Sequence, residues 1–294
     1  MSKWTKPEHP IPNRTDPLWN QCLFAFAVGS NPGARSTLLF SAIDDQRQSR
    51  GSFSSSIPGH FVVSDAGKSI DTLGGSVEIF DWADIGGRYA ISRGFTAAVV
   101  VKPLTTPTLA GLLYVNVWGK LTDFLTKSWS IDYQGNTGDL PAPGWRFTVN
   151  STAAVEVTIP ATTAPSIART DLIVGVYDRV NQDIWLNGKR EGRIANALAV
   201  FNDSTYTLNI RRAVLGATAP NFRVSMIALW NRPLVASEIA RLSSDPYVLW
   251  KSNDDIEALG FVIPPPPIVP SADNDCCRCP SFFNGPLAPV DSFI

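Results

Sequence analysis

Short stretches in which polar and apolar residues alternate, each ending at turn-forming residues, most restrict how this chain of 294 residues can fold. In the stretch 222–230 the even positions are all apolar, while the odd positions begin polar and become apolar. Because side chains of a strand point alternately to its two faces, this pattern predicts a strand with one face buried throughout and the other buried only toward its end. Residues 171–177 are apolar on both faces, as in a central strand.

More such stretches follow along the chain. Residues 183–186 lead into Asn187-Gly188, a pair that tolerates positive φ and therefore predicts a two-residue hairpin turn. Further strands are predicted at residues 95–102, 112–118, 129–133, 145–149, 155–159 and 207–210. Strands this short, separated by turn residues, predict an all-β sandwich or barrel.

One short helix is predicted in this β pattern, at about residues 235–242. It has two apolar residues three positions apart on one face, and Glu238 supplies an acid in its first turn. Asp245-Pro246 then ends the helical stretch.

The two ends of the chain lack the alternation. Residues 1–19 contain four prolines together with charged residues and few aliphatic ones, which predicts an extended arm. Four consecutive prolines at 264–267 favour polyproline II, a stiff spacer. We therefore expect a β-domain at 20–262, an extended N-terminal arm at 1–19, and a proline-rich, cysteine-containing C-terminal tail at 263–294.

Charge and hydropathy argue against two classes of partner. Basic and acidic residues nearly cancel, 25 against 26, and the basic ones are scattered, so binding to nucleic acid is not expected. Apolar runs fall short of the roughly 20 residues that cross a bilayer, so membrane insertion is not expected either. The first residues lead into prolines and charges, which predicts a chain without a secretory signal that is made in a cytoplasm.

Residues 227–242 resemble the closing strand and helix of concanavalin A-like and laminin G-like domains. In that family a strand ends in an aromatic-Asn-Arg step and runs into a Leu, a short helix with a Glu-Ile pair, and a loop with Asp-Pro and aromatic residues. The matching residues here are Trp230-Asn231-Arg232, Leu234, Glu238-Ile239 and Asp245-Pro246-Tyr247-Val248-Leu249-Trp250. One departure is Val235, which stands where the family has a Ser or Thr cap, a loss of about 1 kcal/mol.

Three further stretches are similar to this family in the expected order. Residues 94–103 resemble its early core strand, 172–178 its central strand, and 184–189 its hairpin ending in Asn-Gly. The resemblance covers roughly 20–262 and implies an all-β fold, a two-sheet antiparallel jelly-roll sandwich with one short helix and irregular arms.

A single sandwich of this kind with proline-rich ends resembles structural proteins of tailed bacteriophages, where it is found in tail fibres, receptor-binding tips and capsid decorations. The resemblance implies a virion protein whose sandwich is displayed while its arms anchor it to other virion subunits and gain order on assembly. It also implies a homo-oligomer and leaves open binding to a host surface glycan. The alternatives are a free carbohydrate-binding module and a glycoside hydrolase of concanavalin A-like fold.

Catalytic groups are sparse. Glycoside hydrolysis needs two carboxylates on one face, about 5 to 9 Å apart. In the acidic stretch 78–84, Glu78 and Asp81 would point to opposite faces of a strand, and Glu78 shares its face with Trp82 and Asp84. The two histidines, His9 and His60, lie in the arm and in a predicted loop. We therefore expect no catalytic residues and a protein that is not an enzyme.

Metal ligands are equally hard to assign. Cys276, Cys277 and Cys279 lack the usual paired spacing of zinc ligands and have only Cys22 as a distant partner, so free thiols or a cross-link to another subunit are expected instead. The family often holds calcium at the sandwich rim, and Asp178, Asp183 and Asn187 could gather near one hairpin edge, but they are also ordinary turn residues. No metal site is assigned, no cofactor is expected, and calcium is left open.

Tryptophans divide into two groups. Trp118, Trp129, Trp145, Trp185 and Trp230 lie in predicted strands and are expected to pack in the core. Ligand-binding residues for a glycan cannot be picked out among them. The candidates for contact with a partner subunit are Trp4, Trp19, Trp250, Cys276, Cys277 and Cys279.

Overall fold

The structure is a computed structural model. It describes residues 16–27, 38–40, 50–53, 61–64, 67–71, 77–79, 94–104, 109–116, 127–134, 144–150, 156–197, 208–213 and 222–250. The chain divides into two units, residues 1–261 and 262–294, and all of these described residues belong to the first.

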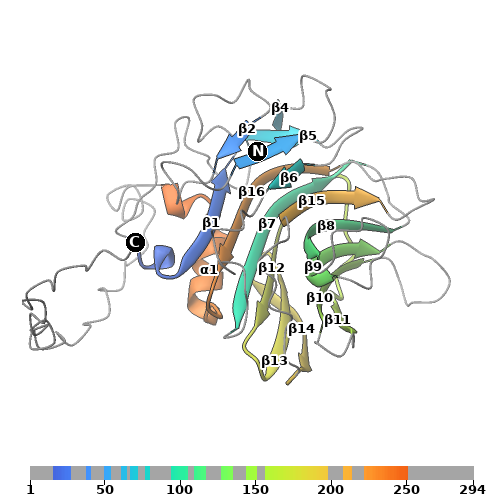
Figure 1. Ribbon diagram of the computed structural model, residues 1–294, viewed down its shortest axis with the longest axis vertical. Coiled ribbons are helices and arrows are strands. Elements are labelled where there is room, and N and C mark those ends of the chain that lie inside the picture. Colours follow the sequence, from blue (N-terminus) through green and yellow to red (C-terminus); the bar gives the residue numbers. More distant parts are fainter. Residues whose placement is uncertain are drawn as a thin grey trace, which may run out of the picture. The chain divides into compact units, whose positions relative to one another are not determined.

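Two antiparallel β-sheets face each other in this unit (Figure 1). Sheet A has the order β14 (Lys189–Ala195), β13 (Asn181–Leu186), β12 (Asp171–Tyr177), β7 (Phe95–Pro103), β16 (Phe222–Trp230), β5 (Gly67–Asp71) and β4 (Phe61–Ser64), and β1 (Cys22–Ala27) also pairs with β16. Sheet B has the order β11 (Glu156–Pro160), β10 (Gly144–Asn150), β9 (Lys127–Gln134), β8 (Leu109–Asn116), β15 (Leu208–Ala213), β6 (Val77–Ile79), β3 (Arg50–Phe53) and β2 (Leu38–Phe40). This arrangement confirms the predicted jelly-roll sandwich.

Most predicted strands are present. The stretches predicted at 95–102, 129–133, 145–149, 171–177, 183–186 and 222–230 each fall within an observed strand. The strands predicted at 112–118, 155–159 and 207–210 are present with shifted bounds, as β8, β11 and β15. Asn187 and Gly188 have φ of 51° and 85° and form the predicted turn between β13 and β14. Strands β1 to β6 and β14 were not predicted.

The predicted helix is α1 (Ala236–Ser244), and it is the α-helix of the described part of the chain. Short 3-10 helices lie at η1 (Pro17–Trp19) and η4 (Val248–Trp250). Asp245 ends α1, as expected. Within these described helices, none is both long and apolar enough to cross a membrane.

A β-bulge in β16 changes which side chains face the core. The register between β16 and β7 shifts between Val224 and Met226. As a result Phe222 and Val224 belong to the core between the sheets, and beyond the shift Ile227 and Leu229 do. The predicted burial is confirmed, since the even positions are buried throughout and the odd ones from Ser225 on, but beyond the shift it is the odd positions that face the core between the sheets.

The core between the sheets is rich in aromatic rings. Phe95 of sheet A lies 5.3 Å from Trp129 and 5.7 Å from Phe147 of sheet B, measured between ring centroids. Trp145 and Phe222 pack across the sheets at 5.9 Å. The prediction that Trp129, Trp145 and Trp230 are buried is confirmed, since all three side chains are fully buried. Trp185 is partly exposed and is not a core residue.

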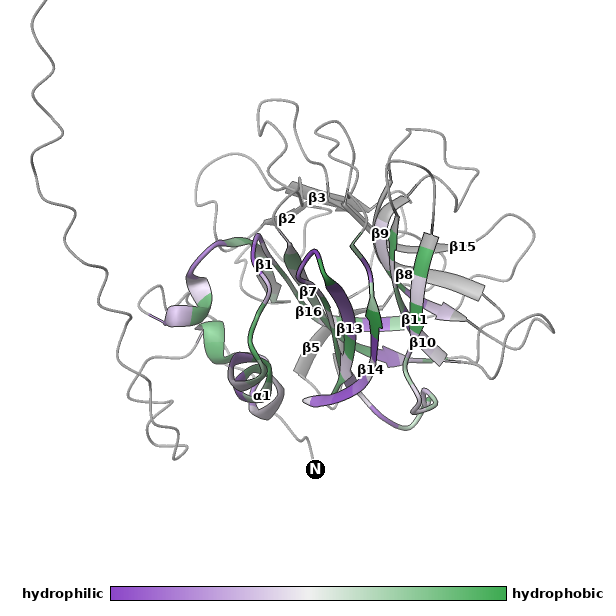
Figure 2. Ribbon diagram, turned by 90° about the horizontal axis from the view of Figure 1, so that it is seen from below, coloured by the Kyte–Doolittle hydropathy of each residue, from purple (hydrophilic) through white to green (hydrophobic). Residues whose placement is uncertain are grey.

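Sheet A also has a second buried face. Side chains that alternate with the core residues, such as Val100, Val174 and Ala228, are buried outside the cluster between the sheets. Helix α1 lies close to this sheet: a Cβ atom on Gly188, in the turn between β13 and β14, would come within 2.7 Å of the Ser243 side chain. Figure 2 shows that the strands in the middle of sheet A are hydrophobic, whereas β14 at its edge is mostly hydrophilic.

Candidate functional site

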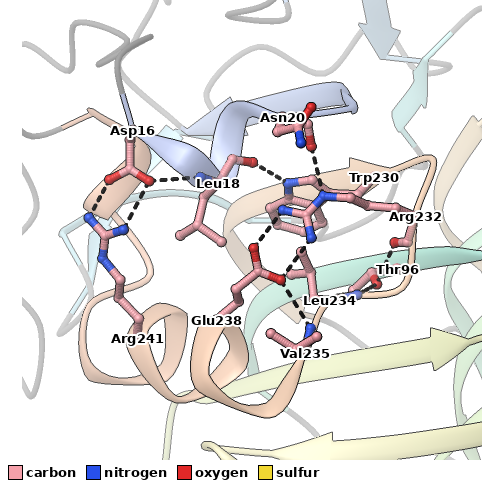
Figure 3. Close-up of polar contacts among 10 residues, drawn as sticks. All are labelled: Asp16, Leu18, Asn20, Thr96, Trp230, Arg232, Leu234, Val235, Glu238 and Arg241. Atoms are coloured by element: carbon pink, nitrogen blue, oxygen red, sulfur yellow. Dashed lines mark hydrogen bonds and ion pairs between the residues drawn. The ribbon is translucent and has the colours of Figure 1, made fainter. Parts of the chain in front are cut away.

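The segment that enters the sandwich lies against the helix that closes it (Figure 3). Asp16 caps η1, because its Oδ1 accepts a hydrogen bond of 2.8 Å from the backbone N–H of Leu18. The same carboxylate accepts two hydrogen bonds from the Arg241 guanidinium of α1, the one to Oδ1 at 3.1 Å. The Asp16 side chain is fully buried and that of Arg241 is 12% exposed.

Three more hydrogen bonds join this segment to the end of β16. The Trp230 indole N–H donates to the Leu18 carbonyl oxygen at 2.5 Å. The backbone N–H of Asn231 donates to the Gln21 carbonyl at 2.9 Å, and Arg232 Nε donates to the Asn20 carbonyl at 2.9 Å. The Trp-Asn-Arg step that suggested the family therefore holds the N-terminal segment in place.

The same arginine fixes the start of α1. Arg232 donates two hydrogen bonds to Glu238, at 2.7 and 2.6 Å, a bidentate pair. Glu238 also accepts a hydrogen bond of 3.0 Å from the Val235 backbone N–H. The valine side chain has no acceptor for the reciprocal bond, so only half of a capping box is present, as the sequence predicted. The Thr96 hydroxyl of β7 also donates a hydrogen bond of 2.9 Å to the Arg232 carbonyl oxygen.

The aromatic candidates Trp19 and Trp250 meet each other. Their ring centroids are 6.3 Å apart in an edge-to-face arrangement, and Trp19 Nε1 donates to the Leu249 carbonyl at 3.1 Å. Trp250 is 3% exposed, so both side chains have contacts within the chain itself. Their role as partner-contact residues stays a prediction. We call residues 16–20, 230–241 and 248–250 the terminal corner.

The terminal corner contains residues that sequence reasoning had assigned to an arm or had not singled out. Residues 16–19 lie in the predicted arm, yet Asp16 and Leu18 are buried. Asp16 followed by Pro17 is a cap signal for a short helix, but no pattern in the sequence pairs it with Arg241, 225 residues away. The other candidates, Trp4, Cys276, Cys277 and Cys279, lie outside the described residues.

Burial controls the acidity of Asp16. It raises the pKa of this carboxyl above its ordinary value, although the Leu18 N–H and the charge of Arg241 both act to lower it. Burying the Asp16 charge costs free energy, and the Leu18 N–H and the Arg241 guanidinium offset this cost.

The three residues considered for calcium do not form one cluster. Asp178 and Asp183 both lie beside Arg193, whose Nε is 2.8 Å from Asp183 Oδ1 and whose Nη2 is 3.8 Å from Asp178 Oδ2. Asn187, at the far end of β13, donates to Asp171 at 2.8 Å. Among the described residues, no group of three or more His, Cys, Asp or Glu side chains is placed to hold a metal ion. The expectation that no cofactor is needed stays a prediction.

The two acids beside Arg193 respond differently to their surroundings. Burial raises the pKa of Asp183, and the nearby charges of Arg193 and Arg190 only partly oppose it. Burial acts in the same direction on Asp178, but hydrogen bonds from the backbone N–H groups of Asn181 and Val180 outweigh it and lower the pKa. Asp178 is therefore a turn-forming residue of this hairpin.

The candidate catalytic residues are mostly outside the described part. Asp81, Trp82, Asp84, His9 and His60 all lie there. Glu78 lies in β6, opposite Asn209 of β15 and Ser52 of β3 in register. That the protein is not an enzyme stays a prediction.

A row of polar side chains lies on the outer face of sheet B. Ser130 and Asp132 alternate with the core residues Trp129, Ile131 and Tyr133 and therefore point away from the core. Ser130 donates to Asp132 at 2.7 Å, and Asp132 is 3.8 Å from Arg146 Nη2 on the adjacent strand.

Hydroxyl groups extend the row. Thr148 of β10 and Thr158 of β11 face each other, with 2.9 Å between their hydroxyl oxygens. Sequence reasoning missed the row, although the polar-apolar alternation of β9 could have revealed it. Ser130, Asp132 and Thr148 are fully buried and hydrogen-bond to one another, so the row is a buried polar network and not a ligand-binding surface.

The sheet order, the closing strand with its Trp-Asn-Arg step, and the helix beside it define a concanavalin A-like sandwich domain. Residues 79–240, more than half of the chain, match the concanavalin A-like lectin/glucanases superfamily in its laminin G form. The chain belongs to this family. No curated protein matches it in sequence.

Solved structures of similar fold include binding domains of toxins. The binding domain of Paraclostridial mosquitocidal protein 1 is 12% identical, with 77% of this chain and 52% of that chain covered at a TM-score of 0.56. The binding domain of botulinum neurotoxin DC in complex with SialylT is 13% identical, covering 76% and 51%, at 0.54. Trypanosoma rangeli sialidase is 16% identical, covering 79% and 34%, at 0.52. The chain spans about half of these binding domains, and the likeness shows the fold alone.

Proposed function

We propose that this protein is a non-catalytic structural or adhesion protein of a bacteriophage virion. The sandwich is displayed and binds a glycan on the host surface, while the segments on either side of it anchor the protein to other virion subunits as a homo-oligomer. The protein is synthesised in the host cytoplasm and functions in the particle.

The observation that carries this proposal is the terminal corner. Asp16, where the described sandwich begins, is bonded to Arg241, and Trp19 packs on Trp250, where it ends. Both boundaries of the sandwich therefore lie at one corner, so a single attachment region serves both flanking segments. Under this proposal the terminal corner is the attachment side of the sandwich, and its other faces serve for display.

Proteins of similar fold support the glycan-binding part. Cell entry of botulinum neurotoxin type C is dependent upon interaction with two ganglioside molecules, and a neurotoxin DC binding domain forms a complex with SialylT. Another such domain binds rat synaptotagmin II, which also supports binding to a protein.

Mass spectrometry of purified particles tests the structural role. Phage particles produced by a genome that encodes this chain should contain it in proportion to other structural proteins, and its absence from them would contradict the proposal. Limited proteolysis gives a matched comparison: cleavage sites before residue 16 and after residue 250 should be accessible in the isolated protein and protected in the particle.

A free carbohydrate-binding module is the alternative supported by the toxin binding domains. It predicts glycan-array binding by the full chain together with absence from particles. A glycoside hydrolase predicts release of reducing sugar that is lost in Asp81→Ala or Asp132→Asn. We expect no release from wild type, because Asp132 is the one carboxylate in the described polar row.

A further inference from the structure

Trp185 of β13 and Arg190 of β14 lie together on the outer face of sheet A. They are directly opposite in register, and the Arg190 Cζ atom lies 5.7 Å from the centroid of the indole ring. Ile184 and Leu186 belong to the core, so Trp185 between them points to the other face. The ring is partly exposed and Arg190 is exposed. The earlier expectation of core packing is therefore wrong for Trp185, and the pair forms an aromatic and cationic surface.

Arg190 has hydrogen-bonding capacity left over. Within the described part of the chain, no carboxylate lies within ion-pair distance of its guanidinium and no acceptor takes a hydrogen bond from it. The guanidinium is a planar fork of donors that matches a carboxylate or sulfate geometrically. Stacking on Trp185 fixes its position, so less entropy is lost when it binds an anion.

The surrounding charges favour an anion. Lys189 is 76% exposed and Arg193 is 45% exposed. The acidic residues that pair with these two cations are buried: Glu191, the partner of Lys189, is 2% exposed, and Asp183, the partner of Arg193, is 10% exposed. Asp178 in the neighbouring turn is 33% exposed and lies 3.8 Å from Arg193, so the side chains that this edge presents to solvent are mostly cations.

We propose that Trp185 and Arg190 form a binding site for an acidic saccharide. The carboxylate or sulfate of the sugar accepts hydrogen bonds from the Arg190 guanidinium, and the apolar face of the sugar ring packs on the exposed part of Trp185. This inference rests on the proposed glycan-binding function and locates it at the β13–β14 edge. A neutral sugar lacks the charged partner and binds more weakly.

Calorimetric titration of the full chain tests the site. The probes are 3′-sialyllactose for a carboxylate, a sulfated disaccharide for a sulfate, and lactose as the neutral sugar. Arg190→Gln is compared with Arg179→Gln, which removes the same charge from an exposed arginine in the β12–β13 turn. We expect Arg190→Gln to weaken binding of the acidic probe roughly tenfold or more, and Arg179→Gln to change it less than about twofold. The acidic probe that binds more tightly identifies the preferred anion.

Tryptophan fluorescence gives a second readout, since Trp185→Phe should keep the fold while weakening binding and reducing the ligand-induced change in emission. Equal affinity of Arg190→Gln and Arg179→Gln, with wild type still binding, would overturn this site and leave the glycan-binding function standing. Binding to other glycans on an array but to neither acidic probe would do the same. A wild-type protein that binds no glycan at all would overturn the glycan-binding function as well.

Discussion

Asp16 and Arg241, 225 residues apart in sequence, form a bidentate ion pair at the point where the sandwich begins and closes. The carboxylate is fully buried, caps η1 and receives both hydrogen bonds from one guanidinium. Such a pair contributes little net stability when both partners are present, but removing one leaves a buried charge uncompensated. The pair therefore fixes where the N-terminal segment lies more than it adds to the stability of the fold.

Replacing Arg241 by Met should lower the free energy of unfolding by about 3 kcal/mol, because Asp16 then loses its countercharge. Adding Asp16→Asn to Arg241→Met should recover part of this loss, since the amide carries no charge. Urea unfolding measures both variants. Lys189→Met is the control: its ammonium is 76% exposed and pairs with Glu191 at 3.1 Å, and Glu191 keeps its hydrogen bonds from Thr162 and Thr163, so this substitution should cost less than about 1 kcal/mol. Equal losses in Arg241→Met and Lys189→Met would show that the buried pair is not special.

The raised pKa of Asp16 gives a pH dependence of defined sign. Between the ordinary value of 3.8 and the higher folded value, the folded protein holds a proton that the unfolded chain has released. The contribution of this carboxyl to stability should therefore fall as the pH rises through that window. The Asn side chain of Asp16→Asn does not titrate in this range. The free energy of unfolding of wild type, taken relative to that of Asp16→Asn, should therefore decline as the pH rises through the window. Urea unfolding at several pH values measures this difference. A relative stability that increases with pH would mean that Arg241 dominates over burial.

Local sequence signals predicted much of the fold. Asn187-Gly188 marked a hairpin turn, and the Trp-Asn-Arg step before the helix marked the closing strand, because both depend on neighbouring residues. The bulge in β16 carries no such marker, so the alternation in 222–230 gave the wrong face beyond Val224. Strand β14 was missed because it is a charged edge strand without apolar alternation.

The candidate sites were harder to predict because they depend on contacts between distant residues. The Asp16–Arg241 pair joins the two ends of the sandwich, and Trp185 was expected in the core although its register places it outside. A period of two shows that neighbouring side chains alternate, but it does not show which face is the core when both faces are largely apolar.

Gly175 of β12 lies directly against the Phe147 ring of sheet B. A Cβ atom there would come within 2.5 Å of the Phe147 ring. Gly175→Ala should therefore destabilise the protein by about 2 kcal/mol through overpacking. In a Phe147→Leu background the same substitution should cost much less, and urea unfolding of the four proteins measures this coupling. Equal costs in both backgrounds would contradict a clash with the ring.

The acidity of Glu191 can be tested at a single carboxyl group. Glu191 lies at the β-bulge opposite Ile184 and Trp185, and its side chain contacts Thr162 and Thr163. Burial acts to raise the pKa of this carboxyl, but hydrogen bonds from Thr162, Lys189 and Thr163 outweigh it and lower the pKa to about 2. The resulting stabilisation is fully present above the ordinary value of 4.5 and should be lost as the pH falls toward about 2.

Carboxyl NMR titration of selectively labelled protein measures this pKa directly. Thr162 donates through its hydroxyl, whereas Thr163 donates through its backbone N–H at 3.0 Å. Thr162→Val should therefore raise the pKa of Glu191, and Thr163→Val should leave it nearly unchanged, although both substitutions remove one hydroxyl of the same loop. An equal shift in the two variants would mean that general exposure of the loop, and not the hydroxyl of Thr162, sets the acidity of Glu191.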